Sequence, residues 1–191
     1  NTALPFIRGD HETIELIERE LRNNKLRVDI FGIKSEGNEA FEAYALDRSR
    51  PSLIPGQVHQ FDVVVRNLGV GHTFPGGTND SNEGWLEISV LDQDNQIVAV
   101  SGLIQEDGHV DPSSHFYKAL MLDKNGEPIH RRNAQDIVTS VYTRVIGPGT
   151  ADVAHFSFLV AESYLGQSLT IKARLLWRKF DRNYTEFSYN K

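Results

Sequence analysis

Hydrophobic residues follow a helical period only near the start of the chain. Ile14, Ile17 and Leu21 are spaced three and four residues apart, so they share one face of a helix. Asp10 precedes this run and can accept hydrogen bonds from the first backbone N–H groups of a helix. The pattern predicts one short helix over residues 11–23, with its apolar face packed on a sheet or on a neighbouring domain.

From residue 26 onward, hydrophobic and polar residues alternate in short runs. Such alternation is typical of half-buried strands, and it is clearest at residues 57–66, 85–91, 137–145, 152–160 and 168–178. Turns rich in aspartate, asparagine and glycine, as hairpins require, occur at residues 92–95 and 123–126. Because no helical pattern interrupts the strands, we predict a mainly β fold, an antiparallel β-sandwich with one short N-terminal helix. An immunoglobulin-like and a jelly-roll strand order both fit.

The inward-facing positions of the predicted strands define a candidate core. Its members are Phe61, Val63, Val65, Leu86, Ile88, Val90, Phe156, Phe158, Leu169, Ile171, Ala173 and Leu175. We divide the chain into an N-terminal part, residues 1–25, and a β-sandwich domain, residues 26–191. Within the first part, residues 2–7 are apolar without a period, and we expect an irregular segment there that leaves another globule.

Size and charge narrow the function classes. The chain has 191 residues, enough for one domain with its own core, and a formal net charge of −6 with dispersed lysine and arginine. Nucleic-acid binding needs a concentrated basic face, so we expect no nucleic-acid partner. No apolar run approaches the length of about 20 residues that crosses a bilayer, so we expect no membrane span. The first residue is asparagine rather than methionine, from which we expect a processed or excised chain.

The segment between the strands predicted at residues 57–66 and 85–91 carries the most chemistry. It is far longer than the roughly 2–5 residues that a hairpin needs, and it is rich in glycine. His72 lies within it and offers an imidazole that can ligate iron or another first-row metal. The alternative is that His72 braces the turn at Phe74 and Pro75 through backbone hydrogen bonds. The surplus length of the loop suggests a site or an interface.

The same segment contains carboxylates and aromatic rings. Asp80 and Glu83 present the oxygen ligands that Ca²⁺ prefers, although loops of this composition also use such atoms for local turns. Trp85 alternates away from the inward positions that follow it, and we therefore take it, with Phe74, as a candidate interface aromatic. An aromatic platform for sugars is an alternative reading of the aromatic residues along the strands, which packing between sheets explains equally well.

No complete catalytic set is present in the sequence. The chain has no cysteine, no serine in a Gly-x-Ser-x-Gly elbow, no phosphate-binding Gly-x-x-x-x-Gly-Lys motif and no dinucleotide-binding fingerprint. His109, His115 and His130 would have to converge with His72 to form a transition-metal centre, and their spacing does not bring them together. We therefore expect a protein that is not an enzyme.

Several motifs along the chain resemble one known family. Residues 71–77 read Gly-His-Thr-Phe-Pro-Gly-Gly, and residues 79–83 read Asn-Asp-Ser-Asn-Glu. With weaker blocks at residues 1–5, 25–30, 100–102, 106–109, 122–126, 129–133 and 146–149, they resemble the cysteine-free C-terminal β-domain that follows the haem-binding part in a group of bacterial multihaem c-type cytochromes. The resemblance covers nearly the whole chain. The chain lacks Cys-x-x-Cys-His, so it cannot attach a c-type haem itself.

The resemblance implies a role and a setting. It implies an accessory or assembly domain of a multihaem cytochrome or electron-transfer complex, located in the periplasm or at the cell surface. The partner would be a haem-bearing domain or subunit, with His72 contacting or ligating its haem from across the interface, and association with further copies of this chain is left open. The alternative is an extracellular module that binds carbohydrate or protein and is stabilised by Ca²⁺.

Overall fold

The computed structural model describes residues 3–35, 43–44, 50–78 and 80–190. It begins with helices α1 (Ala3–Arg8) and α2 (His11–Arg22) and ends with helix α3 (Arg182–Tyr189). Between them lie strands β1 (Leu26–Ser35), β2 (Ala43–Tyr44), β3 (Val58–Asn67), β4 (Glu83–Leu91), β5 (Ile97–Ser101), β6 (Phe116–Tyr117), β7 (Ala119–Leu122), β8 (Pro128–Ile129), β9 (Thr139–Thr143), β10 (Ala151–Leu159) and β11 (Thr170–Arg178). Short 3₁₀ turns occur at Ala134–Asp136 and Glu162–Tyr164.

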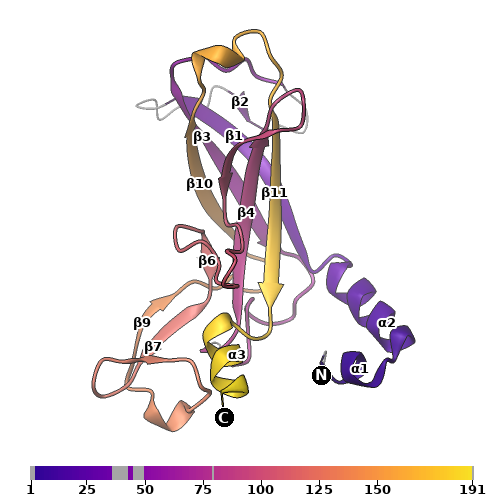
Figure 1. Ribbon diagram of the computed structural model, residues 1–191, viewed down its shortest axis with the longest axis vertical. Coiled ribbons are helices and arrows are strands. Elements are labelled where there is room, and N and C mark those ends of the chain that lie inside the picture. Colours follow the sequence, from indigo (N-terminus) through magenta and orange to yellow (C-terminus); the bar gives the residue numbers. More distant parts are fainter. Residues whose placement is uncertain (1–2, 36–42, 45–49, 79, 191) are drawn as a thin grey trace.

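The described strands form three antiparallel sheets, as Figure 1 shows. The first sheet has the order β10-β3-β1-β2, and the second has the order β11-β4-β5 with β6 beside β4. A smaller third sheet, β8-β7-β9, lies at the end of the molecule that also holds α3. The prediction of a mainly β, antiparallel fold is confirmed, and the five clearest strand predictions each fall on a strand of the structure.

The core lies between the first two sheets. Val63 and Val65 of β3 face Leu86 and Ile88 of β4, and all of them are buried. The alternation predicted these positions because every second residue of a strand points to the same face. Other members of the predicted core lie around this centre. Phe61 and Val90 are buried, while Phe156, Phe158, Leu169, Ile171, Ala173 and Leu175 are half-buried.

Helix α2 begins where the sequence predicts. The Asp10 carboxylate accepts a hydrogen bond from the Thr13 backbone N–H at 3.0 Å and so caps the helix. The expectation of an irregular segment over residues 2–7 is wrong, because α1 occupies most of it. Pro5 lies in the first turn, where its missing N–H is not needed, and Gly9 ends the helix with a φ of 65°. The chain therefore starts with two helices rather than one.

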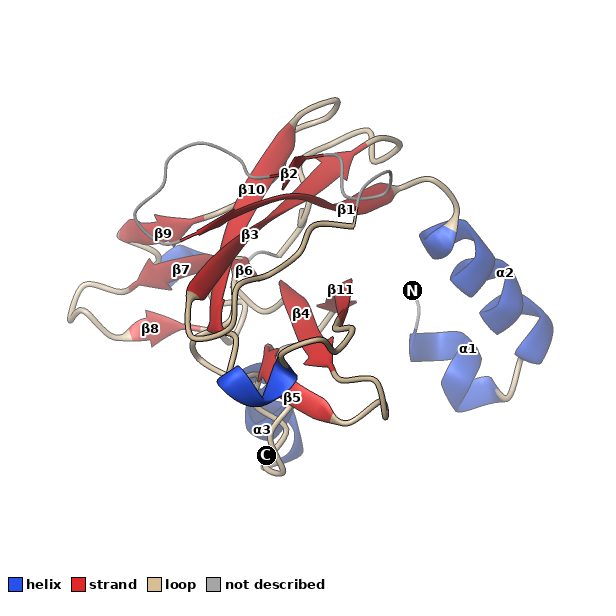
Figure 2. Ribbon diagram, turned by 90° about the horizontal axis from the view of Figure 1, so that it is seen from above, coloured by secondary structure: helices blue, strands red, loops and turns tan. Residues whose placement is uncertain are grey.

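Of the two expected contacts of the N-terminal helix, packing on the sheet is wrong, and packing on a neighbouring domain stays a prediction. Figures 1 and 2 show α1 and α2 set apart from the three sheets. No residue of α2 is buried, and Leu16 and Leu21 are each 51% exposed. An amphipathic period predicts that a helix has an apolar face, but it does not identify what covers that face.

Helix α3 was not predicted from the sequence. Its N-cap is Asp181, whose carboxylate accepts from the Tyr184 backbone N–H at 2.7 Å. The helix spans 8 residues, and its apolar positions are aromatic and partly exposed, so it lacks the aliphatic period that marks α2.

Candidate functional site

The long loop between β3 and β4 is organised by one buried amide. Asn67, the last residue of β3, is fully buried. Its Nδ2 donates to the carbonyl oxygens of His72 at 3.0 Å and Ile146 at 3.2 Å, and its Oδ1 accepts from the Val70 N–H at 3.0 Å. One side chain therefore fixes both the start of the loop and its contact with the segment that leads into β10.

Phe74 ties the middle of the loop to that same segment. Its backbone N–H donates to the Ile146 carbonyl at 2.8 Å, and the Ile146 N–H donates back at 2.7 Å. Its ring is half-buried and lies 6.3 Å from the ring of Tyr117, next to the core. The peptide bond between Phe74 and Pro75 is cis. Phe74 thus has a packing role within the chain, and its contact with a partner stays a prediction.

His72 is exposed and has one ring nitrogen bound within the chain. Its Nδ1 lies 2.6 Å from the Thr73 carbonyl oxygen, which can only accept, so Nδ1 carries the hydrogen. In the neutral ring Nε2 then keeps its lone pair, and no described residue contacts it through a hydrogen bond. A Cβ on Gly76 would lie 2.6 Å from Nδ1 and 2.9 Å from the Thr73 carbonyl oxygen, so a side chain at this position would require the His72 ring and the Thr73 backbone to shift. The ring is braced through one nitrogen and open at the other, which is also how protein metal ligands are oriented.

The two carboxylates of the loop have separate partners. Asp80 accepts from the Arg132 backbone N–H at 2.7 Å. Glu83 is buried, accepts from Arg178 Nε at 2.7 Å, and lies 3.5 Å from the Lys118 ammonium. Among the described residues, no group of three or more metal-ligating side chains is placed to hold an ion. Both carboxylates are engaged by nitrogen donors of this chain, and calcium binding by Asp80 and Glu83 stays a prediction.

Residues far along the chain complete this cluster. Arg132 donates through Nε to the Ser81 hydroxyl at 2.9 Å, and its guanidinium lies over the rings of Phe180 and Tyr184 at 4.8 Å and 4.9 Å. The Asp181 N–H donates to the Ser81 carbonyl at 2.7 Å. The loop therefore connects the second sheet to α3 and to the segment that follows β8.

Burial raises the pKa of Asp181, and the nearby negative charge of Glu83 adds to the rise. The hydrogen bond from the Tyr184 N–H opposes it. The sequence did not predict Arg132, Arg178 or Asp181 as site residues. Nothing in the sequence around them indicates that they contact the loop.

The structure corrects the assignment of Trp85 as an interface aromatic. Trp85 is only 3% exposed, and its Nε1 donates to the Gly102 carbonyl at 3.0 Å. The Arg178 guanidinium lies over its ring at 5.6 Å. Trp85 faces away from the core of Leu86 and Ile88, as expected, but the loop after β5 covers it.

The remaining candidate histidines do not converge. His115 lies 2.7 Å from Asp152 and 3.0 Å from Arg144, and burial lowers its pKa, partly offset by the hydrogen bond to Asp152. His109 is paired with Asp107 at 3.2 Å. Each of these histidines has its own partners in a different part of the fold, and a shared transition-metal site does not form among the described residues.

Comparison with known proteins gives one match. No protein-family model and no curated protein matches the chain. Among solved structures, it is similar to the crystal structure of a penta-haem cytochrome c552 from Thermochromatium tepidum, with a TM-score of 0.56 and 13% identity. The match covers 89% of this chain and 36% of that chain, so this chain spans about a third of the cytochrome's length. The likeness establishes a shared fold. In the described part of the chain, no helix is both long and apolar enough to cross a bilayer.

Proposed function

We propose that this chain is a non-enzymatic accessory domain that packs against the haem-bearing part of a multihaem c-type cytochrome. The observation that carries the proposal is the fold match, because it takes in 89% of this chain and only 36% of a penta-haem cytochrome. The chain has no cysteine, so the haem groups belong to another domain or subunit. A location in the periplasm or at the cell surface belongs to the same proposal.

The α1–α2 pair supports an assembly role. Its apolar side chains extend into solvent, with exposed fractions of 64% for Phe6 and 81% for Ile7, and Leu4, Leu16 and Leu21 are exposed beside them. Several large apolar side chains exposed on one pair of helices are typical of an interaction site. We assign this surface to the contact with the haem-bearing part, and we assign the open Nε2 of His72 to a second contact with a haem or its surroundings.

The alternative of a carbohydrate-binding module is not adopted. Stacking on a sugar needs several exposed aromatic faces, whereas Trp85 and Tyr117 are only 3% and 0% exposed and Trp177 is 38% exposed. No observation favours a separate protein-binding module over a domain of a cytochrome.

The proposal is tested with the native protein. The chain is captured from the cells that produce it, and the eluate is analysed for c-type haem by absorption spectroscopy and for Cys-x-x-Cys-His peptides by mass spectrometry. We expect haem and these peptides in fixed stoichiometry with the chain, either covalently continuous with it or in one complex. A native chain that is never accompanied by haem protein would contradict the proposal.

Two variants locate the contact. Replacing Phe6 and Ile7 with glutamate should release the haem-bearing part. Replacing Val138, just before β9, and Val141, in β9, with glutamate is the matched control and should not, since these positions are 67% and 55% exposed. His72→Ala should change the haem spectrum or weaken the association while leaving the melting temperature of the chain nearly unchanged. A large loss of stability in His72→Ala would mean that this histidine only braces the loop.

A further inference from the structure

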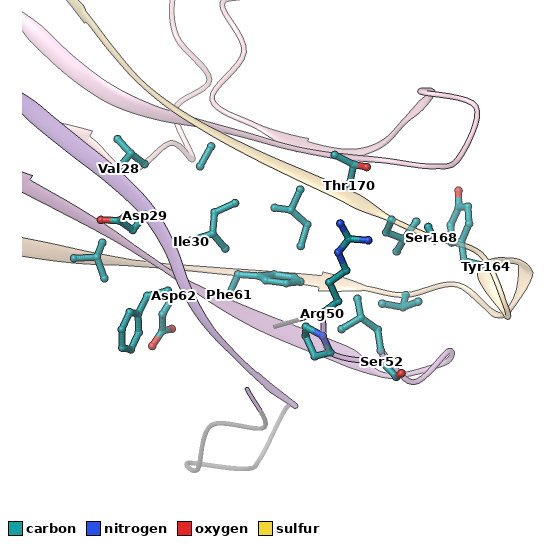
Figure 3. Close-up of a pocket in the computed structure, with 18 of the residues that line it drawn as sticks. Val28, Asp29, Ile30, Arg50, Ser52, Phe61, Asp62, Tyr164, Ser168 and Thr170 are labelled. Atoms are coloured by element: carbon teal, nitrogen blue, oxygen red, sulfur yellow. The ribbon is translucent and has the colours of Figure 1, made fainter. Parts of the chain in front are cut away.

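The sandwich is open along one side. Among the described residues, strand β11 is the end strand of the second sheet and pairs only with β4, and β1 is paired with β2 only at Gly32 and Ile33. The two sheets therefore diverge between β1 and β11. A cleft of about 1490 Å³ lies there, shown in Figure 3.

Apolar side chains lie on both inner walls of this cleft, among polar and charged ones. Val28 and Ile30 of β1 and Phe61 of β3 line one side, and Ile171 and Ala173 of β11 line the other. Phe61 is buried, and the other four side chains are half-buried, with one side against the core and the other side open to the cleft. Apolar concave surface of this kind is typical of ligand sites, which bury a ligand against hydrophobic walls and fix it with few polar groups.

One cation reaches into this apolar space. Figure 3 shows the Arg50 side chain extending into the cleft, with Ser168 and Thr170 nearby on the opposite side. No ion pair or hydrogen bond to another described residue involves the Arg50 guanidinium. A guanidinium is always charged and matches a carboxylate with two parallel hydrogen bonds. Arg50 is therefore placed to receive an anion at the edge of an apolar surface.

The other charged groups at the cleft are already paired. Asp29 lies 2.8 Å from Arg27 and 2.6 Å from Arg66. Asp62 lies 3.4 Å from Lys34 and 2.7 Å from His155. These ion pairs neutralise the carboxylates that would otherwise repel an anionic ligand, and none of the described carboxylates compensates the charge of Arg50.

We infer that the cleft binds a single-chain anionic amphiphile of the fatty-acid class. The carboxylate binds the Arg50 guanidinium, and the alkyl tail lies along Val28, Ile30, Phe61 and Ile171. A sugar or nucleotide would leave polar groups unpaired against the apolar stretch formed by these four residues. An added β-strand from another chain would use the free backbone edges and would have no need of a cation. The inference does not rest on the proposed association with a cytochrome.

Fatty-acid binding is tested with the purified chain. Isothermal titration is carried out with sodium octanoate and sodium dodecanoate below their micelle-forming concentrations, and with dodecanol as the uncharged counterpart. Dodecanoate should bind at least about tenfold more tightly than octanoate, since each buried methylene group adds roughly fourfold in affinity. Amide shifts of Ile30, Phe61 and Ile171 in NMR spectra should follow the same titration.

Arg50→Gln identifies the role of the charge. It should weaken dodecanoate binding by about tenfold or more and leave dodecanol binding unchanged, because a hydrogen bond to a charged group is lost only for the acid. Arg22→Gln on α2 makes the same charge change far from the cleft and should bind like the parent chain. Arg50 is exposed, so its replacement should not affect folding.

Any of the following results would overturn the inference. The first is the absence of dodecanoate binding to the parent chain. The second is equal dodecanoate affinity in the parent chain and Arg50→Gln, or NMR shifts confined to residues outside the cleft. The third is a dimer, seen by sedimentation and unaffected by dodecanoate, whose interface maps to β1 and β11, because the cleft then holds a second copy of the chain.

Discussion

Asn67→Ala tests whether one buried amide organises the loop between β3 and β4. The replacement removes the hydrogen bonds to the His72 carbonyl, the Ile146 carbonyl and the Val70 N–H. Each hydrogen bond contributes a net free energy of about 1 kcal/mol, and a buried partner left unsatisfied costs about 1–3 kcal/mol. The Ile146 carbonyl still accepts from the Phe74 N–H at 2.8 Å, so it is not orphaned. Water can reach the carbonyl of His72, because that residue is exposed.

The expected loss of unfolding free energy is therefore about 3 kcal/mol, the value for three simple hydrogen bonds, because the two carbonyl partners keep another donor or water. Equilibrium urea unfolding followed by circular dichroism measures it, and an unchanged denaturant slope would show that the folded state remains equally compact. Asn125→Ala is the matched control, since Asn125 is exposed in the turn before Gly126, and its replacement should cost less than about 0.5 kcal/mol. A loss for Asn67→Ala no larger than that of the control would refute the reasoning.

Three further replacements test the buried charges and the core. Glu83→Gln should lower the unfolding free energy by about 2–3 kcal/mol in a denaturant titration, because it leaves the charges of Arg178 and Lys118 uncompensated. The side chains of these two residues are 24% and 34% exposed, and contact with water reduces the cost. An unchanged unfolding midpoint would contradict this prediction. Asp181→Asn should raise the melting temperature at pH 7 but not at pH 3. The raised pKa of Asp181 means that the ionised carboxylate destabilises the folded state. This loss of stability is absent below the ordinary pKa of 3.8 and is complete once the pH has risen through the raised pKa. An equal change in melting temperature at both pH values would contradict the prediction. Leu86→Ala should cost roughly 2–5 kcal/mol, since Leu86 is fully buried, and a loss below about 1 kcal/mol would show that the site collapses without a cavity.

The sequence predicted the strands well because alternation is a local signal. A residue such as Val63 belongs to the core when its neighbours two positions away also do, and that information lies within a few residues. The packing of the N-terminal helix could not be predicted in the same way. Its apolar face is visible in Ile14 and Ile17, but the surface that covers a face is determined by the whole fold.

The candidate site shows the same limit. Asp80 and Glu83 lie three positions apart, and the sequence indicated one shared ion site. In the structure their partners are Arg132 for Asp80 and Arg178 for Glu83, which are separated from them by 52 and 95 positions. Contacts over such distances leave no trace in one sequence. His72 could be selected from the sequence because the glycines that mark it as unusual are its neighbours along the chain.

The unpaired edge of β11 also affects how copies of the chain behave toward each other. A free strand edge can pair with the same edge of another molecule and start a polymer. Along β11, Arg174 is ion-paired with Glu87 of β4, whereas Lys172 is exposed, and two such edges in antiparallel contact centred on this residue would bring the two Lys172 side chains together. Like charges opposite one another oppose pairing, so the strand that leaves the cleft accessible also carries a built-in barrier against fibre formation.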